Sequence, residues 1–99
     1  MNTSCIFCRI ANGELPACKV LETPDVLAFM DINPVIKGHT LVIPRAHHDP
    51  ITSVPDELLG KVLAAVKRVV DAQIRGLEAD GVNVTQANGE IAGQIIPHV

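Results

Sequence analysis

Residues 53–77 read SVPDELLGKVLAAVKRVVDAQIRGL and carry the strongest structural signal in the chain. Apolar side chains recur in this stretch at spacings of three and four residues, which gathers them on one face of a helix. They are Leu58, Leu59, Val62, Leu63, Val66, Val69, Val70 and Ile74. Ser53 and Asp56 fit a capping box at the start. Pro55 is tolerated in a first turn, and Gly76 favours termination, so we predict one long amphipathic helix over this range.

Shorter elements precede this helix. Apolar residues alternate in residues 18–22 and 26–30, and the proline in residues 23–25 favours a turn between these two runs. The pattern predicts a β-hairpin. Residues 39–43 predict a third strand, which Pro44 ends.

Residues 5–11 have helical potential at the N-terminus, and residues 82–85 and 95–99 predict two further strands. Strands and helices therefore do not alternate regularly along the chain. This order favours a single α+β domain over residues 1–99, with a mostly antiparallel five-stranded sheet, one long helix and a short N-terminal helix.

Composition and charge narrow the class of protein. A net charge of −3 argues against nonspecific nucleic-acid binding, which requires a basic face. No apolar run approaches the roughly 18 residues that a membrane-spanning helix needs. The N-terminus lacks the pattern of a secretory signal, and three cysteines do not suit a disulfide framework. We therefore expect a cytoplasmic protein.

The pair Cys5-x-x-Cys8 has three interpretations: a redox dithiol, half of a metal site, or two small buried residues. The redox interpretation is disfavoured because a thioredoxin-like dithiol follows a strand, and only four residues precede Cys5. His47, His48 and His98 could supply further metal ligands, since Cys2His2 is a common zinc set. The two adjacent histidines could equally be solvated loop residues, so spacing alone leaves the alternatives open.

Two further places could bind a ligand. Asp31 follows an apolar strand and could accept hydrogen bonds from a ligand or simply hold a turn. Gly89 and Gly93 permit backbone conformations that let a phosphate approach peptide N–H groups, although any tight turn would use such glycines.

Four blocks of sequence, in this order, resemble the histidine-triad (HIT) family, whose motif is His-φ-His-φ-His-φ-φ with φ apolar. They are Cys5-Ile6-Phe7-Cys8, Asp31-Ile32-Asn33-Pro34, Gly38-His39-Thr40-Leu41-Val42-Ile43-Pro44-Arg45-Ala46-His47 and Asn88-Gly89-Glu90-Ile91-Ala92-Gly93-Gln94. The tail that follows the last block ends in Pro97-His98-Val99, which resembles the opening of the triad.

The resemblance implies two sets of site residues. The first set is a structural Zn²⁺ site formed by Cys5, Cys8, His47 and His98, with the adjacent His48 not distinguished from His47. The second set binds a purine nucleotide. Its members are Phe29 and Ile32 as walls of the base pocket, Asp31 as acceptor from the ribose hydroxyls, and Asn88, Gly93 and Gln94 near the phosphate.

The resemblance also implies an activity. In this family the middle histidine attacks the α-phosphate of nucleoside phosphoramidates or dinucleoside polyphosphates, and water hydrolyses the nucleotidyl-histidine intermediate. That histidine corresponds to position 100, beyond Val99, so the chain holds no catalytic nucleophile. We expect a HIT domain truncated after the first triad histidine and inactive in this form. The alternative is a non-catalytic, zinc-stabilised module that binds purine nucleotides. The family also implies a homodimer formed through the long helix and the neighbouring strand, across a two-fold axis.

Overall fold

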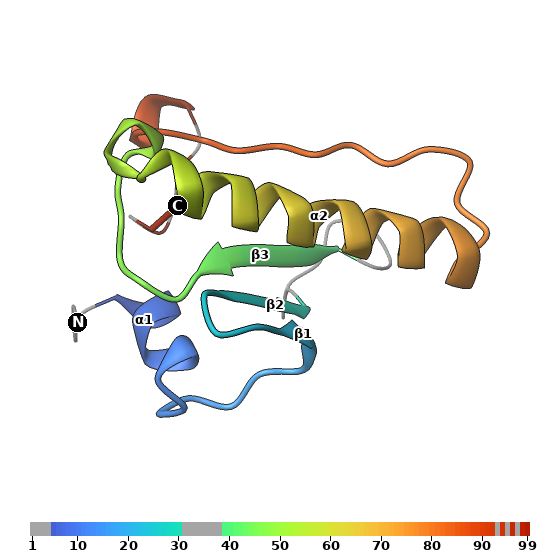
Figure 1. The fold of residues 1–99 in the computed structure, drawn as a ribbon, viewed down its shortest axis with the longest axis horizontal. Coiled ribbons are helices and arrows are strands. Elements are labelled where there is room, and N and C mark those ends of the chain that lie inside the picture. Colours follow the sequence, from blue (N-terminus) through green and yellow to red (C-terminus); the bar gives the residue numbers. More distant parts are fainter. Residues whose placement is uncertain (1–4, 31–38, 93, 95, 97) are drawn as a thin grey trace.

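A small antiparallel sheet lies at the centre of the molecule (Figure 1). The computed structural model describes residues 5–30, 39–92, 94, 96, 98 and 99. The sheet has the strand order β1-β2-β3, in which β1 is Lys19–Glu22, β2 is Val26–Met30 and β3 is Thr40–Pro44. Both neighbouring pairs are antiparallel. The predicted hairpin and third strand are therefore confirmed.

A helix packs against each face of the sheet, the longer one along the strands (Figure 1). Successive side chains of a strand point to opposite faces. Leu27 of β2 accordingly packs with Ile10 of the N-terminal helix α1, Ile6–Ala11, whereas its neighbour Val26 packs with Val62 of the long helix α2, Asp56–Gly76. The sheet thus separates two apolar clusters.

The long helix ends at Gly76, as its sequence predicts, but begins three residues later than expected. The predicted capping box is wrong. Ser53 lies in the 3-10 turn Ile51–Ser53, and its Oγ donates to the Pro50 carbonyl at 2.7 Å. Pro55 occupies the N-cap without a side-chain bond. A serine hydroxyl can bond to nearby backbone groups outside a helix as well as cap one, so the local sequence pattern could not distinguish the two roles.

The five-stranded sheet expected from the sequence is also wrong, since the described residues form three strands. Residues 82–85 do not join the sheet, and the chain after α2 runs back beside this helix (Figure 1). In the range 95–99, Ile95 and Pro97 lie outside the described residues, and neither His98 nor Val99 is in a strand. Strand propensity expresses fit to a neighbouring strand, so a short apolar run does not suffice by itself.

None of the helices in the described part of the chain combines the length and apolar character required to cross a bilayer.

Candidate metal and nucleotide sites

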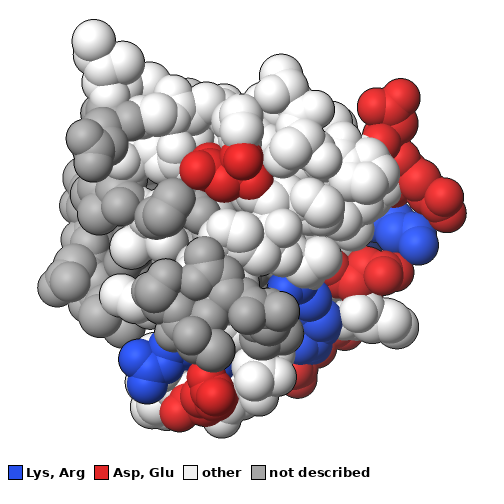
Figure 2. Space-filling model, turned by 90° about the vertical axis from the view of Figure 1, so that its left-hand side faces the viewer, with Lys and Arg blue, Asp and Glu red and all other residues white. Residues whose placement is uncertain are grey.

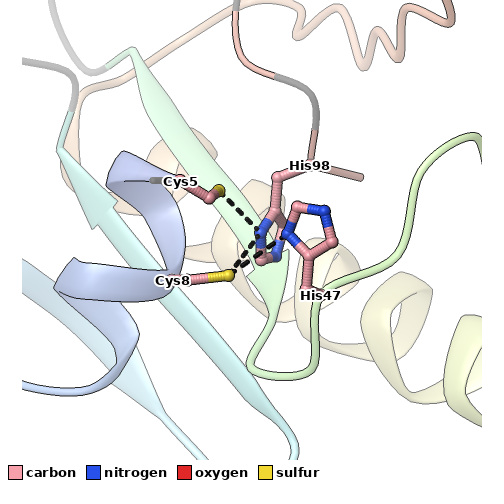
Figure 3. Close-up of side chains that lie close together, drawn as sticks. All are labelled: Cys5, Cys8, His47 and His98. Carbon is pink, nitrogen blue, oxygen red and sulfur yellow. Dashed lines mark hydrogen bonds between the residues drawn. The ribbon is translucent and has the colours of Figure 1, made fainter. Parts of the chain in front are cut away.

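Four predicted metal ligands lie close together and point toward one another (Figure 3). Cys5 and Cys8 come from the start of α1, His47 from the loop after β3, and His98 from the C-terminal segment. The Nδ1 atom of His98 lies 3.4 Å from the Cys5 sulfur and 3.5 Å from the Cys8 sulfur. The Nδ1 atom of His47 lies 3.2 Å from the Cys8 sulfur.

The spacing of these atoms fits a tetrahedral zinc ion. Zn–S bonds of about 2.3 Å and Zn–N bonds of about 2.05 Å put sulfur and nitrogen ligands about 3.6 Å apart. All four ligand atoms lie within 4.8 Å of one another. Cys5, Cys8 and His98 are buried, as in structural sites. The burial of both sulfurs also disfavours the redox interpretation, which needs accessible thiols.

The hydrogen bond of His98 fixes its tautomer. Its Nε2 lies 2.9 Å from the carbonyl oxygen of Pro44. Because a carbonyl can only accept, Nε2 carries the hydrogen and Nδ1 presents a lone pair to the two sulfurs. This is the form of imidazole that binds a metal.

The surroundings of His98 keep its ring neutral. Burial lowers the pKa of His98, and the neighbouring His47 and His48 lower it further. The bond to the Pro44 carbonyl and the Asp49 carboxylate act in the opposite direction, but the net effect on the pKa is downward. The rings of Phe7 and His98 also make an edge-to-face contact, with centroids 5.7 Å apart.

Sequence reasoning did not identify Arg45, which connects the parts that carry the ligands. Its Nη1 donates to the Ala11 carbonyl at the end of α1 (3.1 Å), and its Nε donates to the Thr23 carbonyl (2.9 Å). Its Nη2 lies 3.3 Å from the Glu22 carboxylate. Arg45 lies two residues before His47, so these bonds fix the His47 loop relative to the helix that carries Cys8.

The predicted nucleotide-binding residues are only partly described. Asp31, Ile32 and Gly93 lie outside the described residues. Phe29 is buried in the core and meets the edge of Phe7 at a centroid distance of 5.7 Å. The role of these four residues in binding a nucleotide stays a prediction, as does that of Asn88 and Gln94.

The remaining two predicted residues, Asn88 and Gln94, both form hydrogen bonds with the loop that follows His47. The Oδ1 atom of Asn88 accepts from the Ile51 backbone N–H at 2.8 Å. Gln94 donates from Nε2 to Asp49 at 2.8 Å and accepts at Oε1 from the Gly89 N–H at 2.6 Å. Gly89 has φ +85°, as the predicted tight turn requires. No pattern in the sequence indicated the hydrogen bond between Asp49 and Gln94.

Comparison with known proteins assigns the family. Residues 12–99 match the HIT domain model. The chain is a member of the HIT family. It is 47% identical over 95 residues to an uncharacterised HIT-like protein of Methanocaldococcus jannaschii, covering 96% of this chain and 73% of that protein. It is 44% identical over 96 residues to an adenosine 5'-monophosphoramidase of Schizosaccharomyces pombe, covering 97% of this chain and 69% of that protein.

Solved HIT structures confirm the α+β fold. A HIT family protein from Bacillus anthracis superposes with a TM-score of 0.94 at 39% identity, covering 99% of this chain and 70% of that one. A zinc-bound histidine triad protein from Mycobacterium smegmatis superposes with a TM-score of 0.91 at 38% identity, covering 96% of this chain and 69% of that one.

Proposed function

We propose that this chain is the nucleotide-binding domain of a HIT hydrolase that acts at the α-phosphate of nucleoside phosphoramidates or dinucleoside polyphosphates. The observation that carries this proposal is the 44% identity to the Schizosaccharomyces pombe adenosine 5'-monophosphoramidase over 97% of the chain. The reaction proceeds through a nucleotidyl-histidine, for which imidazole is suited as both nucleophile and leaving group.

The purine nucleotide binds at residues from three parts of the sequence. Phe29 and Ile32 border the base, and Asp31 accepts from both ribose hydroxyls, as a carboxylate can. The phosphate lies against Asn88, Gly93 and Gln94. Support for the phosphate position comes from the positive φ of Gly89 and from the bonds that hold Asn88 and Gln94 beside the loop after His47.

A structural Zn²⁺ is held by Cys5, Cys8, His47 and His98. The distances between their ligand atoms and the tautomer of His98 support this proposal, as does the zinc-bound relative from Mycobacterium smegmatis. When bound, the ion would crosslink α1 to the C-terminal segment, and its binding energy would contribute to folding. His48 is not part of the cluster. Its backbone carbonyl accepts a hydrogen bond from the Val99 N–H at 2.8 Å and so holds the C-terminal segment that carries His98.

The polypeptide of residues 1–99 contains His98 and neither of the following triad histidines. Because loss of a nucleophile removes nearly all activity, this polypeptide should bind nucleotide without turnover. A polypeptide extended by His-φ-His-φ should hydrolyse adenosine 5'-phosphoramidate. An enzyme-like rate with residues 1–99 alone would show that the nucleophile is misassigned. Failure of the extended polypeptide would instead favour the alternative, a non-catalytic binding module.

Binding is tested separately by calorimetric titration with AMP. Asp31→Ala should weaken AMP binding by about 1–3 kcal/mol, because the ribose hydroxyls lose their acceptor. Asp80→Ala, in the turn after α2, makes the same chemical change elsewhere and should leave affinity unchanged. Equal affinities of the wild-type and Asp31→Ala proteins would contradict the proposed pocket.

A further inference from the structure

The carboxylate of Asp49 stands beside the glycine loop in which the phosphate is proposed to lie. Its Oδ1 accepts from Nε2 of Gln94 at 2.8 Å, across 45 residues of sequence. Asp49 is exposed and directly precedes the proline that opens the turn before α2. It is therefore an anionic group within one hydrogen bond of a residue assigned to the phosphate.

The contact also fixes which end of the Gln94 amide faces the loop. The Gly89 backbone N–H can only donate, and it lies 2.6 Å from Oε1 of Gln94. The opposite end of the amide, Nε2, must then point away from Gly89 and toward the Asp49 carboxylate. The orientation of Gln94 thus follows from its two partners, and Asp49 is one of them.

The Asp49 carboxylate bonds to the Gln94 amide and not to a basic side chain of the described residues. No lysine or arginine in the described part of the chain forms an ion pair or hydrogen bond with Asp49, Asn88, Gly89 or Gln94. On this face of the molecule the basic side chains in view lie in the lower part and at the right, near acidic ones (Figure 2). Within residues 5–30, 39–92, 94, 96, 98 and 99, the Asp49 carboxylate is therefore not neutralised by an ion pair with a basic side chain.

We propose that Asp49 is a specificity-determining residue that selects against additional negative charge on the α-phosphate. The favoured ligands carry an uncharged or cationic substituent there, such as the amine of a phosphoramidate, and the disfavoured ligands carry further phosphates. This inference rests on the proposed function, because it requires the phosphate to lie at Gln94. Two unit charges about 6 Å apart in water change an equilibrium constant about threefold.

The test is a comparison of binding ratios with the polypeptide of residues 1–99. Adenosine 5'-phosphoramidate, AMP and ADP form a series in which each member carries one more negative charge. Asp49→Asn retains an oxygen that can accept from Gln94 but removes the charge. The ratio of dissociation constants between successive ligands of the series should therefore be about threefold smaller in this variant than in the wild type. The difference should shrink as salt is raised, because the group is exposed.

Two further variants separate charge from structure. Asp80→Asn removes the same charge in the turn that follows α2, at the opposite end of the molecule (Figure 1), and should leave the ratios unchanged. Asp49→Ala also removes the acceptor for Gln94, so it should lose the discrimination and bind all three ligands more weakly. Circular dichroism verifies that each variant is folded.

The outcomes distinguish this inference from the proposed function. If AMP does not bind the wild-type polypeptide, the proposed nucleotide site is wrong and the inference fails with it. If AMP binds but the ratios of Asp49→Asn equal those of the wild type, the site stands and the role of Asp49 is wrong. An equal shift in Asp80→Asn would also overturn it, since net charge alone would then explain the effect.

Discussion

At the scale of single residues, one guanidinium connects three parts of the molecule. Arg45 bonds the end of α1, the β1–β2 turn and the side chain of Glu22. Its place at a helix C-terminus is favourable, because cations are stabilised by the carbonyl end of a helix. A lysine cannot reproduce this arrangement, because its single ammonium lacks the planar fork of donors.

Arg45→Lys should therefore weaken metal binding and stability together. We expect a loss of about 1–2 kcal/mol in the free energy of unfolding, because backbone carbonyls lose charged partners. Titration with Co²⁺, whose absorption reports tetrahedral thiolate ligation, should show a raised dissociation constant.

The matched control for this change is Arg9→Lys. Arg9 lies in α1 and faces Glu14 at 3.8 Å, where both side chains are about half exposed, so the change should alter stability by under about 0.5 kcal/mol. If Arg45→Lys destabilises the metal-free protein but leaves the Co²⁺ dissociation constant unchanged, Arg45 has no part in positioning the ligands.

At the scale of elements, the sequence predicted those that depend on local pattern. The helical period of α2 and the alternation of apolar residues in β1 and β2 were sufficient to predict these elements, because each apolar face is formed by residues close in the sequence. Residues 82–85 were misassigned because strand formation depends on a distant partner, which a local pattern does not specify.

The candidate site likewise combines one motif that is visible locally with contacts between segments far apart in the sequence. Cys5-x-x-Cys8 suggested a metal by spacing, but its partner His98 lies 90 residues after Cys8, and only the family resemblance selected it. The contacts of Asp49 and Arg45 had no sequence signal, because each depends on loops that meet only in the folded chain.

The short helix α1 provides a test of the metal site. It has six residues and no side-chain cap, so it cannot be stable alone and depends on packing and ligation. Cys8→Ser should abolish zinc-dependent stabilisation, which is measured by thermal unfolding with and without Zn²⁺. Cys18→Ser is the matched control, since Cys18 is exposed and outside the cluster. Elemental analysis without bound metal in wild-type protein prepared without chelator would contradict the site.

At the scale of the whole molecule, α2 retains apolar side chains that the sheet does not cover. Val62 packs against Val26 of the sheet and Val69 is also buried, whereas Leu63 is 63% exposed and Ile74 is 46% exposed. Leu77 beyond the helix end is also exposed. A domain of this size would be expected to cover such a stripe with a partner, which supports the predicted homodimer formed through α2.

A second copy of the chain should therefore pack against this stripe in solution. Sedimentation equilibrium at micromolar concentration should give twice the monomer mass for the wild type. Leu63→Glu should give the monomer mass with little loss of monomer stability, because the side chain is already mostly exposed and a buried charge would oppose pairing. Ile6→Glu on α1 is the control, since Ile6 is 48% exposed and its helix packs on the other face of the sheet, and it should stay dimeric. A monomeric wild type would reject the dimer, and a dimeric Leu63→Glu variant would place the interface elsewhere.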